Sequence, residues 1–180
     1  MKLFETERLL LRPWQESDLQ DFYEYGRNPE VGPNAGWKPH ENIGESREIL
    51  EKFVKSNNEF AIVLKENGKA IGSMGFEIDR THNENLGKGR ELGYVLSHDY
   101  WGRGLMPEAV RGALKYVFEE REYDYFAVAH FPFNQRSKRV IEKCGFRYQK
   151  TLKDSAVNYD GTKLDELCYV MTKEDYFSHR

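Results

Sequence analysis

Cysteine is scarce in this chain of 180 residues, which contains only Cys144 and Cys168. Two thiols form at most one disulfide bond, and no CxxC pair is present, so a disulfide-stapled fold is excluded. The histidines are scattered, and no HxxxH pair places two imidazoles on one helical face. The sequence therefore predicts reduced cysteines in the core and no bound metal.

Long apolar runs and an excess of positive charge are also missing. No stretch approaches the roughly 18 apolar residues of a membrane helix, and the N-terminal MKLFETERLL lacks the apolar core of a signal peptide. The 27 Lys and Arg against 30 Asp and Glu give a formal charge of -3, which supplies no broad field for a nucleic-acid backbone. We expect a cytoplasmic protein with no membrane partner and no nucleic-acid partner.

The composition is typical of one globular domain. Hydrophobic residues make up 39% and charged residues 32%, and the 15 Gly and 6 Pro are spread along the chain. The sequence contains no internal repeat, low-complexity tract or linker. It therefore predicts a single domain over residues 1–180.

Hydrophobic periodicity predicts an α/β chain with the element order β-α-α-β-β-β-α-β-α-β-β. Helices are expected over about 17–26, 42–56, 107–120 and 134–144. Strands are expected over about 8–14, 59–65, 69–77, 90–97, 125–130, 146–151 and 164–171, with a hairpin turn at Asn67-Gly68. The long segment 26–43 is rich in Gly, Pro and Asn, and a loop of this kind usually shapes a site.

The segment WGRGL, from Trp101 to Leu105, lies between a predicted strand and a predicted helix. A helix N-terminus presents unpaired backbone N–H groups at the positive end of its dipole, which attracts anions. Gly102 and Gly104 allow a phosphate to approach the backbone closely, and Arg103 adds a cation. A simple chain reversal explains the glycines equally well. A dinucleotide fingerprint is excluded because Pro107 replaces the third glycine, and the Gly-Lys-Ser/Thr of a P-loop is absent.

Four segments resemble, in order and spacing, the GNAT superfamily of acyl-CoA-dependent N-acyltransferases, and especially its ribosomal-protein N-terminal acetyltransferase branch. They are TERLLLRPWQESDL, ELGYVLSHDYWGRGLMPEAV, NQRSKRVIEKCGFRY and ELCYVMTKEDYF. The resemblance implies a three-layer fold with a mixed, largely antiparallel sheet of six to seven strands and about four helices. It departs from the family at Asp99, where a Gln or Arg is common.

The same resemblance implies acetyl-CoA as the co-substrate, without a metal. The fourth and fifth strands would separate to admit its pantetheine arm, and the backbone near Val95 and Leu96 would pair with the amides of that arm. Asn134 would contact the cofactor, although an Asn at a helix start is also an ordinary N-cap. The resemblance places Arg103 to Glu108 around the diphosphate, and the cofactor-binding residues predicted in this segment are Trp101, Gly102, Arg103, Gly104, Leu105, Met106 and Glu108.

Attack of an amine on a thioester requires a neutral amine, and therefore a group that accepts its proton. Glu91 is the candidate base because the family often places a glutamate in this strand, although it could equally be a solvated surface charge. Ser137 occupies the place of a group that protonates the CoA thiolate, with a back-bond to the helix as its alternative role. Tyr94 and His98 are reserve candidates for the proton path.

The sequence thus predicts an acetyl-CoA-dependent N-acetyltransferase that transfers acetyl to a primary amine by direct attack in a ternary complex. A protein N-terminus is the acceptor that the resemblance implies. The alternatives are a small amine, such as a drug or a polyamine, and an acyl-CoA-binding module without turnover. The loops 26–43 and 154–163 are expected to line the acceptor side. The chain is expected to be a monomer or a homodimer.

Overall fold

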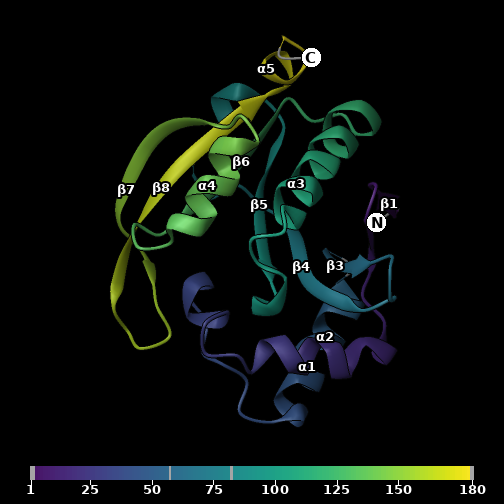
Figure 1. The fold of residues 1–180 in the computed structure, drawn as a ribbon. Helices are drawn as coiled ribbons and strands as arrows, with labels where there is room; N and C mark the ends of the chain where they lie inside the picture. Colours follow the sequence, from purple (N-terminus) through teal and green to yellow (C-terminus); the bar gives the residue numbers. More distant parts are fainter. Residues whose placement is uncertain (1–2, 57, 82, 179–180) are drawn as a thin grey trace. The chain divides into compact units, whose positions relative to one another are not determined.

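The computed structural model describes residues 3–56, 58–81 and 83–178, and Figure 1 labels its helices and strands. Contacts within the chain divide it into two compact units. The first consists of Met1–Gly75 and Tyr94–Leu105, and the second consists of Phe76–Gly93 and Met106–Arg180. The chain therefore passes between the units after Gly75, Gly93 and Leu105. A single domain over residues 1–180 stays a prediction.

The first unit is built on antiparallel strands. Strand β1 (Phe4–Glu5) pairs with β2 (Leu9–Pro13), which pairs with β3 (Glu59–Leu64), which pairs with β4 (Ala70–Glu77). The turn between β3 and β4 contains Asn67 and Gly68, as the sequence predicts. Gly68 has a φ of 73°, a conformation that glycine adopts without a steric penalty.

Helices α1 (Leu19–Gly26) and α2 (Ile43–Ser56) follow the predicted ranges closely. Helix α2 begins where the side-chain oxygen of Asn42 accepts the backbone N–H of Glu45 at 3.1 Å. Short 3-10 turns precede α1 (η1, Glu16–Asp18) and lie in the long loop (η2, Gly32–Ala35). The apolar faces of both helices share one core, formed by Trp14, Leu19, Phe22, Tyr25, Val31, Leu50, Ala61, Val63 and Ala70.

The second unit contains the part of the sheet in which parallel and antiparallel pairings meet. Strand β5 (Gly89–Leu96) is parallel to β6 (Tyr125–His130), β6 is antiparallel to β8 (Lys163–Thr172), and β8 is antiparallel to β7 (Arg147–Val157). The described pairing of β5 with β6 runs from Gly89 opposite Tyr125 to Leu92 opposite Val128, so the last residues of β5 extend beyond it.

The helical elements of this half are α3 (Leu105–Lys115), its π-helical continuation η5 (Tyr116–Glu120), α4 (Gln135–Lys143), α5 (Lys173–Ser178) and the turn η3 (Glu84–Leu86). One further 3-10 turn, η4 (His98–Tyr100), follows β5 in the first unit. Helix α4 covers one face of the second unit's strands (Figure 1). On that face the Met171 methyl group of β8 lies against Gly145, two residues after the end of α4. None of the helices in the described ranges is long and apolar enough to cross a lipid bilayer.

Hydrogen-bonded neighbours run in the order β1-β2-β3-β4-β5-β6-β8-β7, which confirms the predicted mixed and largely antiparallel α/β fold. The sheet has eight strands where six to seven were expected, and the described chain has five α-helices where about four were expected. The additions are β1 and α5, which span only two and six residues. Elements this short are below the window in which periodicity is informative.

Candidate active site

The predicted anion-binding turn lies in the first unit, between η4 and α3. Gly102 and Gly104 have φ angles of 77° and 75°, so both need the left-handed freedom of glycine. Both are exposed, and a Cβ placed on Gly102 would meet nothing within 4 Å. The main chain is therefore open to a ligand at the point where α3 begins.

Two arginines lie at this turn. The Arg8 side chain, at the entrance to β2, donates a hydrogen bond to the carbonyl oxygen of Arg103 at 3.1 Å. The Arg103 guanidinium lies 5.0 Å from the centroid of the Tyr100 ring, a distance typical of a cation–π contact. Sequence reasoning identified Arg103 but missed Arg8, because the two segments are separated by more than ninety residues and no local pattern links them.

The end of β5 gives Val95 and Leu96 different surroundings. The Val95 carbonyl oxygen lies against Gly72 of β4, where it would overlap a Cβ, and the N–H of Ser97 donates to Ile71 at 2.7 Å. Backbone groups alternate along a strand, so those of Leu96 point to the other edge of β5. The Leu96 carbonyl accepts the Trp101 indole N–H at 2.8 Å. The N–H of Leu96 is therefore the group of this pair that an added strand would reach.

Glu91 lies in β5 within the second unit, opposite Ala127 of β6. Its side chain is buried, with the residue 6% exposed, so it is not the solvated surface charge that the sequence also allowed. One carboxylate oxygen accepts the backbone N–H of Arg80 at 3.0 Å, and the other lies 3.3 Å from the Arg80 guanidinium. This carboxylate raises the pKa of Arg80, with a smaller contribution of the same sign from Glu166.

A second buried carboxylate shares the same guanidinium. Glu166 of β8 is 9% exposed, and its carboxylate oxygen lies 3.7 Å from Arg80. Its other oxygen accepts the Ser155 hydroxyl at 2.9 Å. Sequence reasoning missed both Arg80 and Glu166, because Arg80 lies in a loop and Glu166 follows Glu91 by seventy-five residues.

The two cysteines are poor nucleophiles. Burial, reinforced by the negative charges of Glu166 and Glu91, raises the pKa of Cys168 to about 11. Burial also raises the pKa of Cys144 to about 11, against a weak opposing effect of Arg111. The thiolate is the reactive form, so thiols with a pKa this high react poorly at neutral pH. Both cysteines are buried, as the sequence predicts.

Asn134 and Ser137 lie at the start of α4. The Asn134 side chain accepts the Ser137 backbone N–H at 3.0 Å, so Asn134 does act as an N-cap. Both side chains are half-buried. Strand alternation puts Glu91, Cys168 and Glu166 on one face of the second unit's strands, whereas α4 covers the face that carries Met171.

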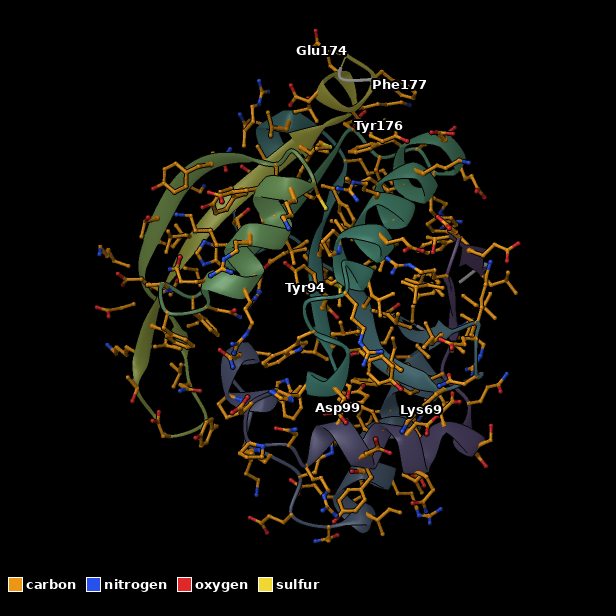
Figure 2. All side chains as sticks on the ribbon, in the orientation of Figure 1. Lys69, Tyr94, Asp99, Glu174, Tyr176 and Phe177 are labelled. Atoms are coloured by element: carbon orange, nitrogen blue, oxygen red, sulfur yellow. The ribbon has the colours of Figure 1, made fainter. Side chains whose placement is uncertain are left out.

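The remaining predicted residues have varied surroundings. Leu105 and Met106 are buried in the first turn of α3 and Glu108 is half-buried there. Tyr94 lies in β5 and Asp99 lies in η4 (Figure 2). His98 pairs with Glu30 of the long loop at 2.9 Å, and its ring lies 4.7 Å from that of Trp101.

Within the described residues no cluster of metal-ligating side chains is present.

Comparison with known proteins identifies the family of this chain. The family model described as acetyltransferase (GNAT) domain matches residues 8–147. The uncharacterized N-acetyltransferase p20 of Bacillus licheniformis is 26% identical over 181 residues, covering 98% of this chain and 99% of its own.

Two solved structures match nearly the whole chain. A GNAT-family acetyltransferase from Bacillus anthracis has a TM-score of 0.84 at 24% identity, covering 96% of this chain and 99% of its own. The ribosomal-protein-S5-alanine acetyltransferase of Vibrio fischeri has a TM-score of 0.74 at 23% identity, and the match covers 98% of this chain and 99% of the Vibrio fischeri chain. These two similarities show the fold.

Proposed function

This chain belongs to the GNAT family of acetyltransferases, and from that premise we propose that it transfers acetyl from acetyl-CoA to the α-amino group of a protein N-terminus. The transfer is a direct attack in a ternary complex. The new amide bond forms as the thioester bond breaks, and the products are the acetylated amine and CoA.

The glycine turn carries the proposal. Its exposed backbone at Gly102 and Gly104 precedes the N-terminus of α3, and the Arg8 and Arg103 guanidinium groups flank it. Backbone N–H groups at a helix start, together with cations, are the usual means of holding a diphosphate. We assign the diphosphate of acetyl-CoA to this turn, and we assign a pantetheine amide to the Leu96 N–H.

The chemistry of the amine favours an N-terminal acceptor over a lysine side chain. At pH 7 roughly one-tenth of the α-amino groups with a pKa near 8 are neutral. Deprotonating a lysine side chain at that pH costs about 4.6 kcal/mol, so a far smaller fraction of lysine side chains is neutral. We assign Glu91 as the group that takes the amine proton, directly or through one water. The Vibrio fischeri relative is a ribosomal-protein-S5-alanine acetyltransferase, which is consistent with this acceptor class.

We assign Ser137 as the hydroxyl that donates a proton or a hydrogen bond to the departing thiolate. Glu91 is on the face of the second unit's strands opposite α4, and Ser137 belongs to α4, so the two assignments concern separate groups that separate variants can test.

A panel of acceptors tests the assignment. Peptides with free N-termini, the same peptides with blocked N-termini, polyamines and aminoglycosides are incubated with acetyl-CoA, and the acetylated products are identified by mass spectrometry. We expect acetylation of free N-termini only. Acetylation of polyamines or aminoglycosides alone supports a small-molecule acetyltransferase. Tight CoA binding without any acetylated product supports a binding module.

A further inference from the structure

We propose that Arg80 is a positioning residue that fixes the carboxylate of Glu91, with Glu166 as the anchor of its guanidinium. The inference rests on the proposed role of Glu91 in taking the amine proton. It concerns residues of the second unit alone.

Both carboxylate oxygens of Glu91 are contacted by this one residue. The Arg80 backbone N–H donates to one oxygen at 3.0 Å, and its guanidinium donates to the other at 3.3 Å. Two donors on two oxygens define the rotation of the carboxylate plane as well as its direction. Each oxygen retains a second lone pair, so the group can still accept a proton from an amine or a water.

The loop that carries Arg80 is itself fixed on both sides. Asp79 accepts the backbone N–H groups of Thr81 and Asn83 at 2.7 and 3.2 Å, and the Tyr125 hydroxyl of β6 at 2.9 Å. Burial by itself would raise the pKa of Asp79, but these hydrogen bonds outweigh it and lower the pKa. The ionised Asp79 thus holds the backbone on either side of Arg80, so that the Arg80 N–H points at Glu91.

The side chain of Arg80 needs a separate anchor because it is 67% exposed. An exposed arginine has many rotamers, and holding one of them costs conformational entropy. Glu166, 3.7 Å from the guanidinium and held by the Ser155 hydroxyl at 2.9 Å, supplies that anchor. The guanidinium also compensates the charge of the buried Glu91, so thermal melting is measured beside the rates to separate an effect on orientation from an effect on folding.

The test compares Arg80→Gln, Arg80→Lys and Glu166→Gln with Arg90→Gln. Arg90 precedes Glu91 and its guanidinium lies 5.5 Å from the Tyr123 ring, so Arg90→Gln makes the same change of charge nearby without touching the Glu91 carboxylate. Crystal structures of the variants show the orientation of Glu91. Steady-state rates are measured with acetyl-CoA and the best peptide of the acceptor panel, and thermal melting reports on folding.

We expect Arg80→Gln to leave Glu91 in a rotated or multiple orientation and to lower kcat about 100-fold, the scale of a misplaced catalytic group, with KM for acetyl-CoA unchanged. Arg80→Lys restores much of kcat, Glu166→Gln has a smaller effect of the same kind, and Arg90→Gln resembles the parent. An Arg80→Gln protein with the parent's Glu91 orientation or the parent's kcat overturns the inference.

Glu91→Gln separates this failure from failure of the proposed function. If Glu91→Gln keeps the parent's rate, the role of Glu91 is wrong. If Glu91→Gln is inactive while Arg80→Gln is fully active, only the positioning inference is wrong. If the parent acetylates no acceptor, the proposed function fails, and the orientation of Glu91 in the Arg80→Gln crystal still decides whether Arg80 positions it.

Discussion

At the scale of single residues, Glu91 is a buried carboxylate, and hydrophobic packing does not explain why a charged group lies at this position. A buried charge is costly unless it is paired, and here the pairing comes from Arg80. A chain that needed only a packed strand at this position would be served by an apolar residue. The buried carboxylate is therefore best understood as a functional group.

Replacing Glu91 by Gln should lower kcat by about 100- to 10,000-fold, the usual contribution of a general base. The amide has the same shape but takes no proton, so we expect calorimetry to show unchanged affinity for CoA. Glu51→Gln, an exposed change in α2, serves as the control for loss of one negative charge. A Glu91→Gln enzyme with at least a tenth of the parent's kcat contradicts the assignment.

His40 predicts a pH dependence of stability in the first unit. It is 6% exposed, its Nδ1 lies 2.6 Å from the Ser46 hydroxyl, and burial lowers its pKa below the usual value near 6.5. Below pH 6.5 the unfolded chain takes up a proton that the folded chain resists, so the free energy of unfolding falls as the pH drops through that range.

Chemical denaturation at pH 7 and at pH 5 measures this effect. The parent should lose more stability between the two values than His40→Gln, which has no group that titrates at this position. Equal losses for the two proteins show that the buried imidazole does not govern this part of the profile.

The residues that sequence reasoning identified and those that it missed differ in one physical respect. Glu91 and Ser137 were chosen because their own segments resemble the family. Arg8, Arg80 and Glu166 acquire their roles from partners distant along the chain, and a single sequence does not reveal such pairs.

At the scale of elements, the turn from η4 into α3 depends on the backbone of Gly104. Gly104→Val introduces a β-branched side chain at a φ of 75°, which costs about 1–3 kcal/mol of stability and fills the space beside the proposed diphosphate. We expect calorimetry to show weaker CoA binding by this variant, with the fold retained.

Gly68→Val is the matched control. Gly68 has a φ of 73° and nothing within 4 Å of its added Cβ, so it bears the same backbone strain in the turn between β3 and β4. The two variants should lose similar stability, and only Gly104→Val should lose affinity for CoA. Equal CoA affinity in both variants shows that the turn does not hold the diphosphate.

Elements with strong local patterns were predicted well. The strand Tyr125–His130 has its predicted bounds, and the turn at Asn67-Gly68 follows from the left-handed freedom of its residues. Strand β7 runs to Val157 instead of the predicted 151, because irregular pairing between Leu152 and Ala156 and a positive φ at Asp154 interrupt the alternation of its side chains. A bulged, mostly exposed strand lacks the pattern by which strands are recognised.

At the scale of the whole molecule, the family resemblance predicted the fold class, and residues 8–147 match the GNAT family model. The acceptor could not be predicted in the same way. Segment 26–43 packs Val31 and Trp37 against the hydrophobic core, and β7 continues through 154–157, so neither segment carries a sequence pattern that identifies a substrate. The chemistry of the amine favours a protein N-terminus over a lysine side chain, and the acceptor panel identifies the substrate within that class.

Two-substrate initial rates, with acetyl-CoA and the best acceptor of the panel varied together, test the central claim most directly. Direct attack in a ternary complex predicts reciprocal plots that intersect, and an enzyme whose intact mass is unchanged after exposure to acetyl-CoA alone. Parallel plots, together with an acetyl group on Cys144, Cys168 or another side chain, would show that the enzyme is acetylated first and would contradict the account.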